Sequence, residues 1–214
     1  MALKESAQSF IRYVKEKGGF DVTTAEGRLK GALKASAGQG APKGSVQTPN
    51  TEFKNAIQQE LDSFMNTVMS KNPLTQNDYD QAFDETVKRM MTAAEEKDRT
   101  CYITFGRIQK IINIWIKYHV MLAFAEVDEA LYGKYKALLP VAHVPVDKKV
   151  RVWFQEKLSD ANNAAIVKTI TSWKKYLTRE QYYALQYDAR DNASRFDAGS
   201  ALELEARVMG EWQA

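Results

Sequence analysis

The sequence predicts an all-α protein that folds as a compact multi-helix domain. Apolar residues recur every three or four positions along most of the chain, which is the period of a helix with one side facing a core. No segment shows the convincing apolar–polar alternation of a half-buried β-strand. Thr75 and Thr178 each precede an acidic or amide residue by three positions, a capping-box pattern that begins helices. We therefore expect roughly eight to ten helices.

Residues 1–35 are expected to form an N-terminal helical arm. Its first helix is expected over Leu3–Lys17, where a glycine pair ends the pattern, and its second over Thr23–Ala35. So few residues cannot enclose a core of their own, and the arm should dock on the main body or exchange onto a second copy of the chain. Residues 36–50 are rich in Gly, Pro, Ser and Gln, which is typical of a flexible linker.

Residues 51–214 are expected to form the main helical domain. Stripes of apolar residues at helical spacing run through this part of the chain. The expected helices are Thr51–Met69, a segment beginning at Thr75, Phe105–Ala125, Asp128–Leu138, a segment opened by Pro145-Val146-Asp147 and running through Leu158, Ala161–Tyr176, Thr178–Arg190 and Ala201–Trp212.

Composition narrows the possible classes of protein. The chain has 214 residues, which suits one domain or one domain with a small appendage. Cys101 is the single cysteine, so an intrachain disulfide and a cysteine-rich zinc or iron–sulfur site are excluded. Two histidines without nearby paired carboxylates do not favour a metal site, and we expect no metal and no cofactor. The net charge of +3 permits nucleic-acid binding without demanding it.

The chain is also expected to have no membrane segment. Its first residues lack the apolar run of a signal peptide. No stretch reaches the roughly 18 consecutive apolar residues that a membrane-spanning helix needs. Together with the single cysteine, this favours a cytoplasmic location.

The segment TFGRIQKIINIWIKYHV, residues 104–120, is the most informative helix. On a helical wheel its polar side chains Gln109, Lys110, Asn113 and Lys117 form one strip, opposite a broad apolar arc. Gly106 lies on the same strip, which suggests that another part of the chain approaches the backbone closely there. Two interpretations stay open. The lysines extend from a half-buried helix to solvent, or the strip lines a site in which a lysine acts as nucleophile or base.

The segment AHVPVDKKVRVWF, residues 142–154, is the second informative stretch. Asp147 stands where a helix N-cap is expected, and a capping role alone would account for it. Lys148, Lys149 and Arg151 place a basic cluster at the start of the same helix. The cluster is either a solvated face or a contact for phosphate groups.

These two segments resemble motifs of the helix-hairpin-helix DNA glycosylase superfamily, most closely its archaeal 8-oxoguanine branch. The motifs are QKxxNxxxKY at residues 109–118 and HVPVD at residues 143–147. The same pair also looks like that of a set of bacterial helical proteins without a settled function. The resemblance covers residues 100–158, and the superfamily's glycine-rich hairpin is absent from this chain.

The resemblance implies a base-excision chemistry on DNA. Lys110 would be the nucleophile that attacks the sugar C1′ as the damaged base leaves, and Asp147 would assist it. An amine can form a Schiff base with the sugar, and a carboxylate can stabilise positive charge that develops there. The expected substrate-binding residues are Gln109, Asn113, Lys117 and His143. The expected DNA-binding residues are Lys148, Lys149 and Arg151.

Three functional hypotheses therefore stand. The first is a DNA-acting protein, in its fullest form a glycosylase or lyase. The second is a non-catalytic helical interaction protein, in which the polar strip is an internal hydrogen-bond network that fixes helix packing. The third is nucleic-acid binding without chemistry, which a steep dependence on salt would reveal.

Overall fold

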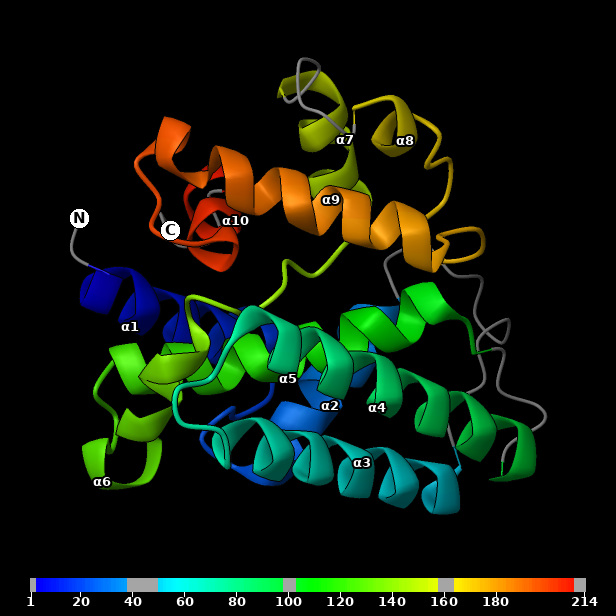
Figure 1. Ribbon diagram of the computed structural model, residues 1–214. Coiled ribbons are helices and arrows are strands. Elements are labelled where there is room, and N and C mark those ends of the chain that lie inside the picture. Colours follow the sequence, from blue (N-terminus) through cyan, green and yellow to red (C-terminus); the bar gives the residue numbers. More distant parts are fainter. Residues whose placement is uncertain (1–2, 38–49, 98–102, 158–163, 210–214) are drawn as a thin grey trace.

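The computed structural model describes residues 3–37, 50–97, 103–157 and 164–209. These residues form ten α-helices and no strand (Figure 1), which confirms the all-α prediction. The α-helices are α1 Leu3–Tyr13, α2 Ala25–Ala37, α3 Thr51–Met69, α4 Gln76–Lys97, α5 Phe105–Phe124, α6 Glu129–Tyr132, α7 Lys148–Lys157, α8 Ala164–Lys168, α9 Arg179–Asn192 and α10 Ala201–Met209. A π-helical turn, Val14–Gly18, follows α1, and 3-10 turns span Gly133–Leu138 and Ala193–Phe196.

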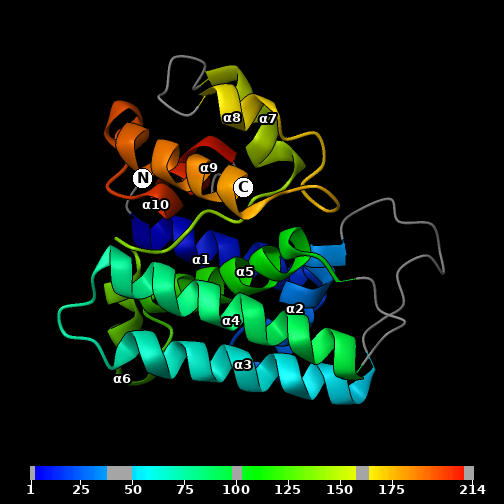
Figure 2. The same cartoon turned by 45° about the vertical axis from the view of Figure 1, so that its right-hand side comes forward.

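The helices are arranged in two layers. Helices α1 to α5 form one layer, and α7 to α10 lie together above it, as both views show (Figures 1 and 2). In the first layer α5 packs against α1, α2 and α4, while α3 packs along α4. The chain crosses from one layer to the other through the non-helical residues 142–147. This crossing contains the HVPVD motif, so the motif lies where the layers meet.

Helix α5 is the core element of the protein. Of its 20 residues, only Phe105, Ile114 and Phe124 are more than slightly exposed. Thr104 caps it by accepting a hydrogen bond from the backbone N–H of Arg107, since the first turn of a helix has unpaired donors. His119 is buried in the apolar arc, and its Nδ1 lies 2.9 Å from the carbonyl oxygen of Trp115. The strip of polar side chains is therefore carried on a helix that the protein surrounds.

The N-terminal arm packs on its own chain. Helices α1 and α2 both lie against α5, and Phe10 of α1 belongs to the main hydrophobic core. Of the expected linker, residues 36 and 37 belong to α2, and Asn50 caps α3 by accepting a hydrogen bond from Phe53 N–H at 2.8 Å. Residues 38–49, like Cys101, lie outside the described residues.

One predicted helix, Ala161–Tyr176, is wrong in its second half. Helix α8 ends at Lys168, and residues 169–178 form turns and irregular backbone. The carbonyl of Ile170 accepts hydrogen bonds from the side chains of Arg151 and Gln155, at 2.8 and 3.2 Å. Because α7 supplies these donors, the backbone is satisfied without another helical turn. Residues 161–163 lie outside the described part of the chain.

Candidate functional site

Two glutamines hold the HVPVD segment between the layers. The side-chain amide of Gln109 on α5 donates to the carbonyl of Val146 at 2.7 Å and accepts from its N–H at 3.1 Å. Gln186 on α9 bonds Val144 in the same two-way manner, at 2.9 and 2.8 Å. Pro145 between them has no N–H to satisfy. The amide side chains thus take the place that a neighbouring strand has in a sheet, and they fix the start of α7.

Lys110 and Asp147 meet as an ion pair. Lys110 Nζ lies 3.0 Å from Asp147 Oδ2, and the side chains are 10% and 24% exposed. Asp147 Oδ1 accepts a hydrogen bond from Val150 N–H at 3.0 Å, so the predicted cap of α7 is confirmed. Burial raises the pKa of the Asp147 carboxyl, but the Lys110 charge and the backbone donors outweigh burial and hold it below its usual value. Asp147 is therefore ionised at neutral pH.

The indole of Trp173 covers this pair. Lys110 Nζ lies 4.8 Å from the centroid of the ring, within the range of a cation–π contact. The turn reaches this position because Gly106 has no side chain. A Cβ on Gly106 would lie 1.7 Å from the carbonyl oxygen of Trp173. The close approach expected at Gly106 is therefore confirmed, and Trp173 makes it.

Positive charge gathers around the same ring. Lys174 Nζ lies 5.5 Å from the Trp173 centroid. Burial lowers the pKa of Lys174, and the charges of Arg107 and Lys110 lower it further. Lys148 and Lys149 are exposed in the first turn of α7, directly after Asp147. We call the set Arg107, Lys110, Lys148, Lys149, Lys174 and Trp173 the Trp173 surface. Arg151, the third predicted phosphate contact, instead donates to Ile170.

The remaining side chains of the polar strip bond inside the protein. Asn113 Nδ2 donates to the hydroxyl of Tyr182 at 2.8 Å and to Gln109 Oε1 at 3.1 Å. Lys117 Nζ pairs with Glu205 of α10 at 2.9 Å, and their side chains are 0% and 4% exposed. Asn113 and Lys117 therefore belong to an internal polar network rather than to an open cleft, and Lys117 does not reach solvent.

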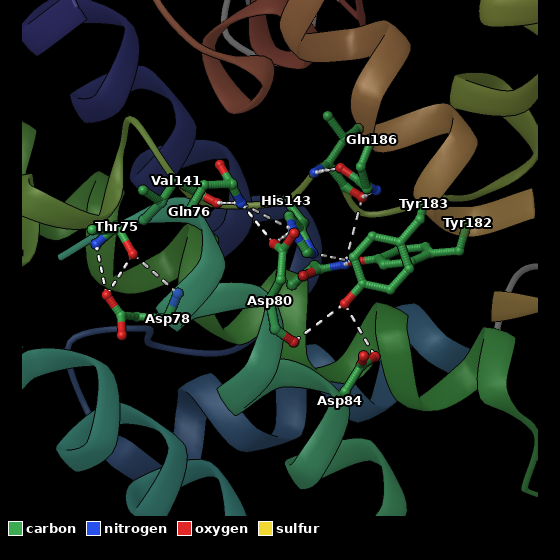
Figure 3. Close-up of polar contacts among 12 residues, drawn as sticks. Thr75, Gln76, Asp78, Asp80, Asp84, Val141, His143, Tyr182, Tyr183 and Gln186 are labelled. Carbon is green, nitrogen blue, oxygen red and sulfur yellow. Dashed lines mark hydrogen bonds and ion pairs between the residues drawn. The ribbon is translucent and has the colours of Figure 1, made fainter. Parts of the chain in front are cut away.

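His143 belongs to the same internal network. Its imidazole lies 2.8 Å from Asp80 Oδ1 through Nε2 and 2.8 Å from the hydroxyl of Tyr182 through Nδ1 (Figure 3). Burial lowers the pKa of His143, although Asp80 opposes this. Because a carboxylate only accepts hydrogen bonds, the neutral ring donates from Nε2 to Asp80 and accepts the Tyr182 O–H at Nδ1. His143 thus links α4 to α9 and is buried, with 1% of its surface exposed.

The residues that bond the polar strip and the HVPVD segment are not identified in the sequence analysis. They come from other helices and are Gln76, Asp80, Tyr182, Gln186 and Glu205. Tyr182 and Gln186 stand four positions apart, so they share a face of α9. Two polar residues on the buried face of a helix are a signal that could have identified both.

A cleft of about 760 Å³ lies between α4 and α9. Figure 3 shows part of its wall, where Asp80 and Asp84 of α4 face Tyr183 of α9. We call it the α4–α9 cleft; its lining residues are Asn77, Asp80, Gln81, Asp84, Glu85, Lys88, Ile166, Arg179, Glu180, Tyr183, Ala184 and Tyr187.

No family model, curated protein or solved structure matches this chain. Within residues 3–37, 50–97, 103–157 and 164–209, no group of three or more His, Cys, Asp or Glu side chains is placed to hold a metal ion. In the same ranges, none of the helices combines the length and the apolar character that crossing a bilayer requires.

Proposed function

We propose that this chain is a non-catalytic DNA-binding protein that holds the phosphate backbone on the Trp173 surface. The observation that supports this most directly is the excess of cations there. Lys110 and Lys174 lie against one indole ring, Arg107 acts electrostatically on Lys174, and Asp147 pairs with Lys110. Arginine and lysine side chains grouped in this way attract phosphate groups. A cytoplasmic location belongs to the same proposal.

The two exposed lysines of α7 are the residues expected to contact phosphate directly. Lys148 and Lys149 extend into solvent, whereas Arg107 and Lys110 are buried. The buried cations would raise the local potential and keep the surface electropositive. The polar strip behind them, with its internally bonded Asn113, supports binding without chemistry.

A salt titration tests this proposal. Fluorescence anisotropy with a labelled random duplex should show binding at low salt, with log Kd rising steeply against log salt concentration. The double variant Lys148→Gln/Lys149→Gln should reduce that slope by about one to two.

The matched control changes two lysines elsewhere. Lys17→Gln/Lys30→Gln removes the same charge from exposed positions in the N-terminal arm, and it should leave the slope unchanged. Absence of binding at low salt, or equal loss in the two double variants, would contradict the proposal.

A second candidate is glycosylase or lyase chemistry at Lys110, as in the helix-hairpin-helix superfamily. It is favoured by the primary amine that lies 3.0 Å from a carboxylate oxygen beside an aromatic ring. The amine must lose its proton before it attacks a sugar aldehyde, and Asp147 is an acceptor within reach. Borohydride should then trap a covalent adduct with an abasic oligonucleotide. Lys110→Ala should abolish the adduct, and Lys148→Gln should retain it. An adduct that survives Lys110→Ala rejects this candidate.

A further inference from the structure

The α4–α9 cleft carries a second kind of chemistry, which the Trp173 surface does not use. Its volume of about 760 Å³ lies in the usual range of ligand-binding pockets in proteins. Its lining has four carboxylates against two cations, so it is acidic in a chain whose net charge is +3. The carboxylates come from both walls, with Asp80, Asp84 and Glu85 on α4 and Glu180 on α9.

One of the chain's own arginines demonstrates what this cleft accepts. The guanidinium of Arg179 lies 4.7 Å from the ring centroid of Tyr183 and donates through Nε to Asp84 Oδ2 at 3.0 Å. The hydroxyl of Tyr183 donates to the other oxygen of Asp84, also at 3.0 Å. The carboxylate of Asp84 thus supplies a hydrogen-bond acceptor for the planar guanidinium, and the ring of Tyr183 supplies a face on which it stacks. This geometry suits guanidinium better than the compact ammonium of lysine.

A second arginine stacks on a tyrosine one helical turn further along α9. Arg190 lies 4.8 Å from the ring centroid of Tyr187, and the Tyr187 side chain lines the cleft. Tyr187 is 48% exposed. The tyrosines of α9 therefore form a wall on which planar cations stack.

The resident arginine lies mostly in solvent. The side chain of Arg179 is 65% exposed, whereas that of Asp84 is 17% exposed. An ion pair with one partner in solvent contributes little stability. A second cleft carboxylate, Asp80, uses Oδ1 for both of its side-chain donors, His143 and Gln76. Among the described residues no donor is bonded to its Oδ2, which leaves an acceptor for an incoming cation.

We propose that the α4–α9 cleft binds arginine side chains of a peptide partner. A partner's guanidinium stacks on Tyr183 or Tyr187 and bonds the carboxylates of α4, and Arg179 moves into solvent to admit it. The cleft and the Trp173 surface are made by different residues, so binding of a basic peptide is independent of binding of DNA. The proposal therefore stands or falls separately from the proposed function.

The test is a direct titration with a defined peptide. A fluorescein-labelled glycine–serine peptide with two arginines is titrated with the full chain at low salt, and anisotropy gives Kd. The same peptide with citrulline in place of arginine keeps the shape without the charge. We expect the arginine peptide to bind and the citrulline peptide to show no binding. Equal binding of both peptides overturns the proposal.

Variants of the cleft give changes of opposite sign. Arg179→Gln removes the competing cation, and it should tighten peptide binding by roughly two- to fivefold. Glu85→Gln/Glu180→Gln removes two wall carboxylates and should weaken binding by about threefold or more. The matched control Glu16→Gln/Glu52→Gln makes the same charge change at exposed positions outside the cleft, and it should leave Kd unchanged.

The remaining outcomes also decide the matter. If Arg179→Gln weakens binding, or if the control pair loses as much affinity as the cleft pair, the peptide does not bind in the cleft. If spermidine displaces the peptide at the concentration at which the unlabelled arginine peptide does, the cleft recognises charge alone and the assignment to arginine is wrong. Duplex binding measured on Arg179→Gln should equal that of the unchanged chain.

Discussion

Lys110 and Lys117 lie two turns apart in the polar strip of α5, and each is paired with an acidic residue. The two pairs differ in their exposure to solvent. Lys117 is sealed, with a side chain 0% exposed, and it joins three helices that are distant in sequence. Its Nζ bonds Glu205 of α10 and lies 4.9 Å from the ring centroid of Phe10 on α1. Lys110 reaches a carboxylate that still contacts solvent, beside exposed lysines. The packing of neighbouring helices, rather than the strip itself, decides which lysine is structural.

The largest effect is expected from breaking the sealed pair. Lys117→Met removes the cation that lies against the buried carboxylate of Glu205, which should cost about 3–5 kcal/mol in the free energy of unfolding. Urea denaturation followed by circular dichroism measures the loss. Because total stability is commonly about 5–15 kcal/mol, this variant should be close to unfolding at 37 °C.

The double variant distinguishes a lost ion pair from lost packing. Lys117→Met/Glu205→Leu removes both charges and should recover most of the loss, because a buried pair replaced by apolar side chains is often neutral. If the double variant is less stable than Lys117→Met alone, the pair contributes through shape and not through charge.

The next effect is a loss of stability in acid that comes from His119, two positions beyond Lys117. Burial, together with the charges of Arg28 and Lys134, lowers the pKa of His119 to about 3. The unfolded chain binds a proton near the ordinary pKa of 6.5 and the folded chain does not, so unfolding becomes easier as the pH falls below 6.5. Two pH units below that value, His119 alone should cost about 2–3 kcal/mol.

Urea melts at pH 7.5, 6.0 and 4.5 measure this dependence. His119→Asn keeps a donor for the Trp115 carbonyl and does not titrate, so its stability should fall less over the same range. His143 acts in the same direction, because burial lowers its pKa also. An unchanged pH dependence in His119→Asn would show that the ring binds its proton as readily in the folded state as in the unfolded state.

Several helix boundaries and one ion pair could be predicted from the sequence. The bounds of α3 and the start of α5 are predicted correctly, because helical periodicity is a local signal. The capping box of Thr178 is confirmed as well. The pairing of Lys110 with Asp147, two residues 37 positions apart, is suggested by the two motifs.

Long-range partners could not be derived in the same way. Glu205 stands 88 positions from Lys117, and periodicity shows only that a residue faces inwards, not which helix faces it. His143 was expected at a substrate site, but its neighbours Asp80 and Tyr182 enclose it from α4 and α9. The helix expected at residues 161–176 ended early because side chains of α7 bond its carbonyls, which no local pattern reveals.

A smaller effect is expected at the other end of the strip. Lys110→Met removes a pair that is partly exposed and leaves Asp147 bonded to the backbone of α7. The cost should lie between those of surface and buried pairs, about 1–2 kcal/mol. Urea denaturation beside Lys117→Met gives the comparison. Equal losses in the two variants would show that the Trp173 surface excludes water as fully as the core.

The smallest effect is the response of the two pairs to salt. Double-mutant cycles on Lys110 with Asp147 and on Lys117 with Glu205 give a coupling energy for each pair, free of the effects of each single change. Screening acts on charges that solvent reaches, so raising NaCl from 0.05 to 0.5 M (about 14 to 4 Å in screening length) should lower the first coupling by a few tenths of a kcal/mol. The second coupling should stay constant, because Glu205 and Lys117 are enclosed. A salt-sensitive Lys117 pair would mean that water enters between α1 and α10 in solution, and the contrast between the two lysines would then be one of degree.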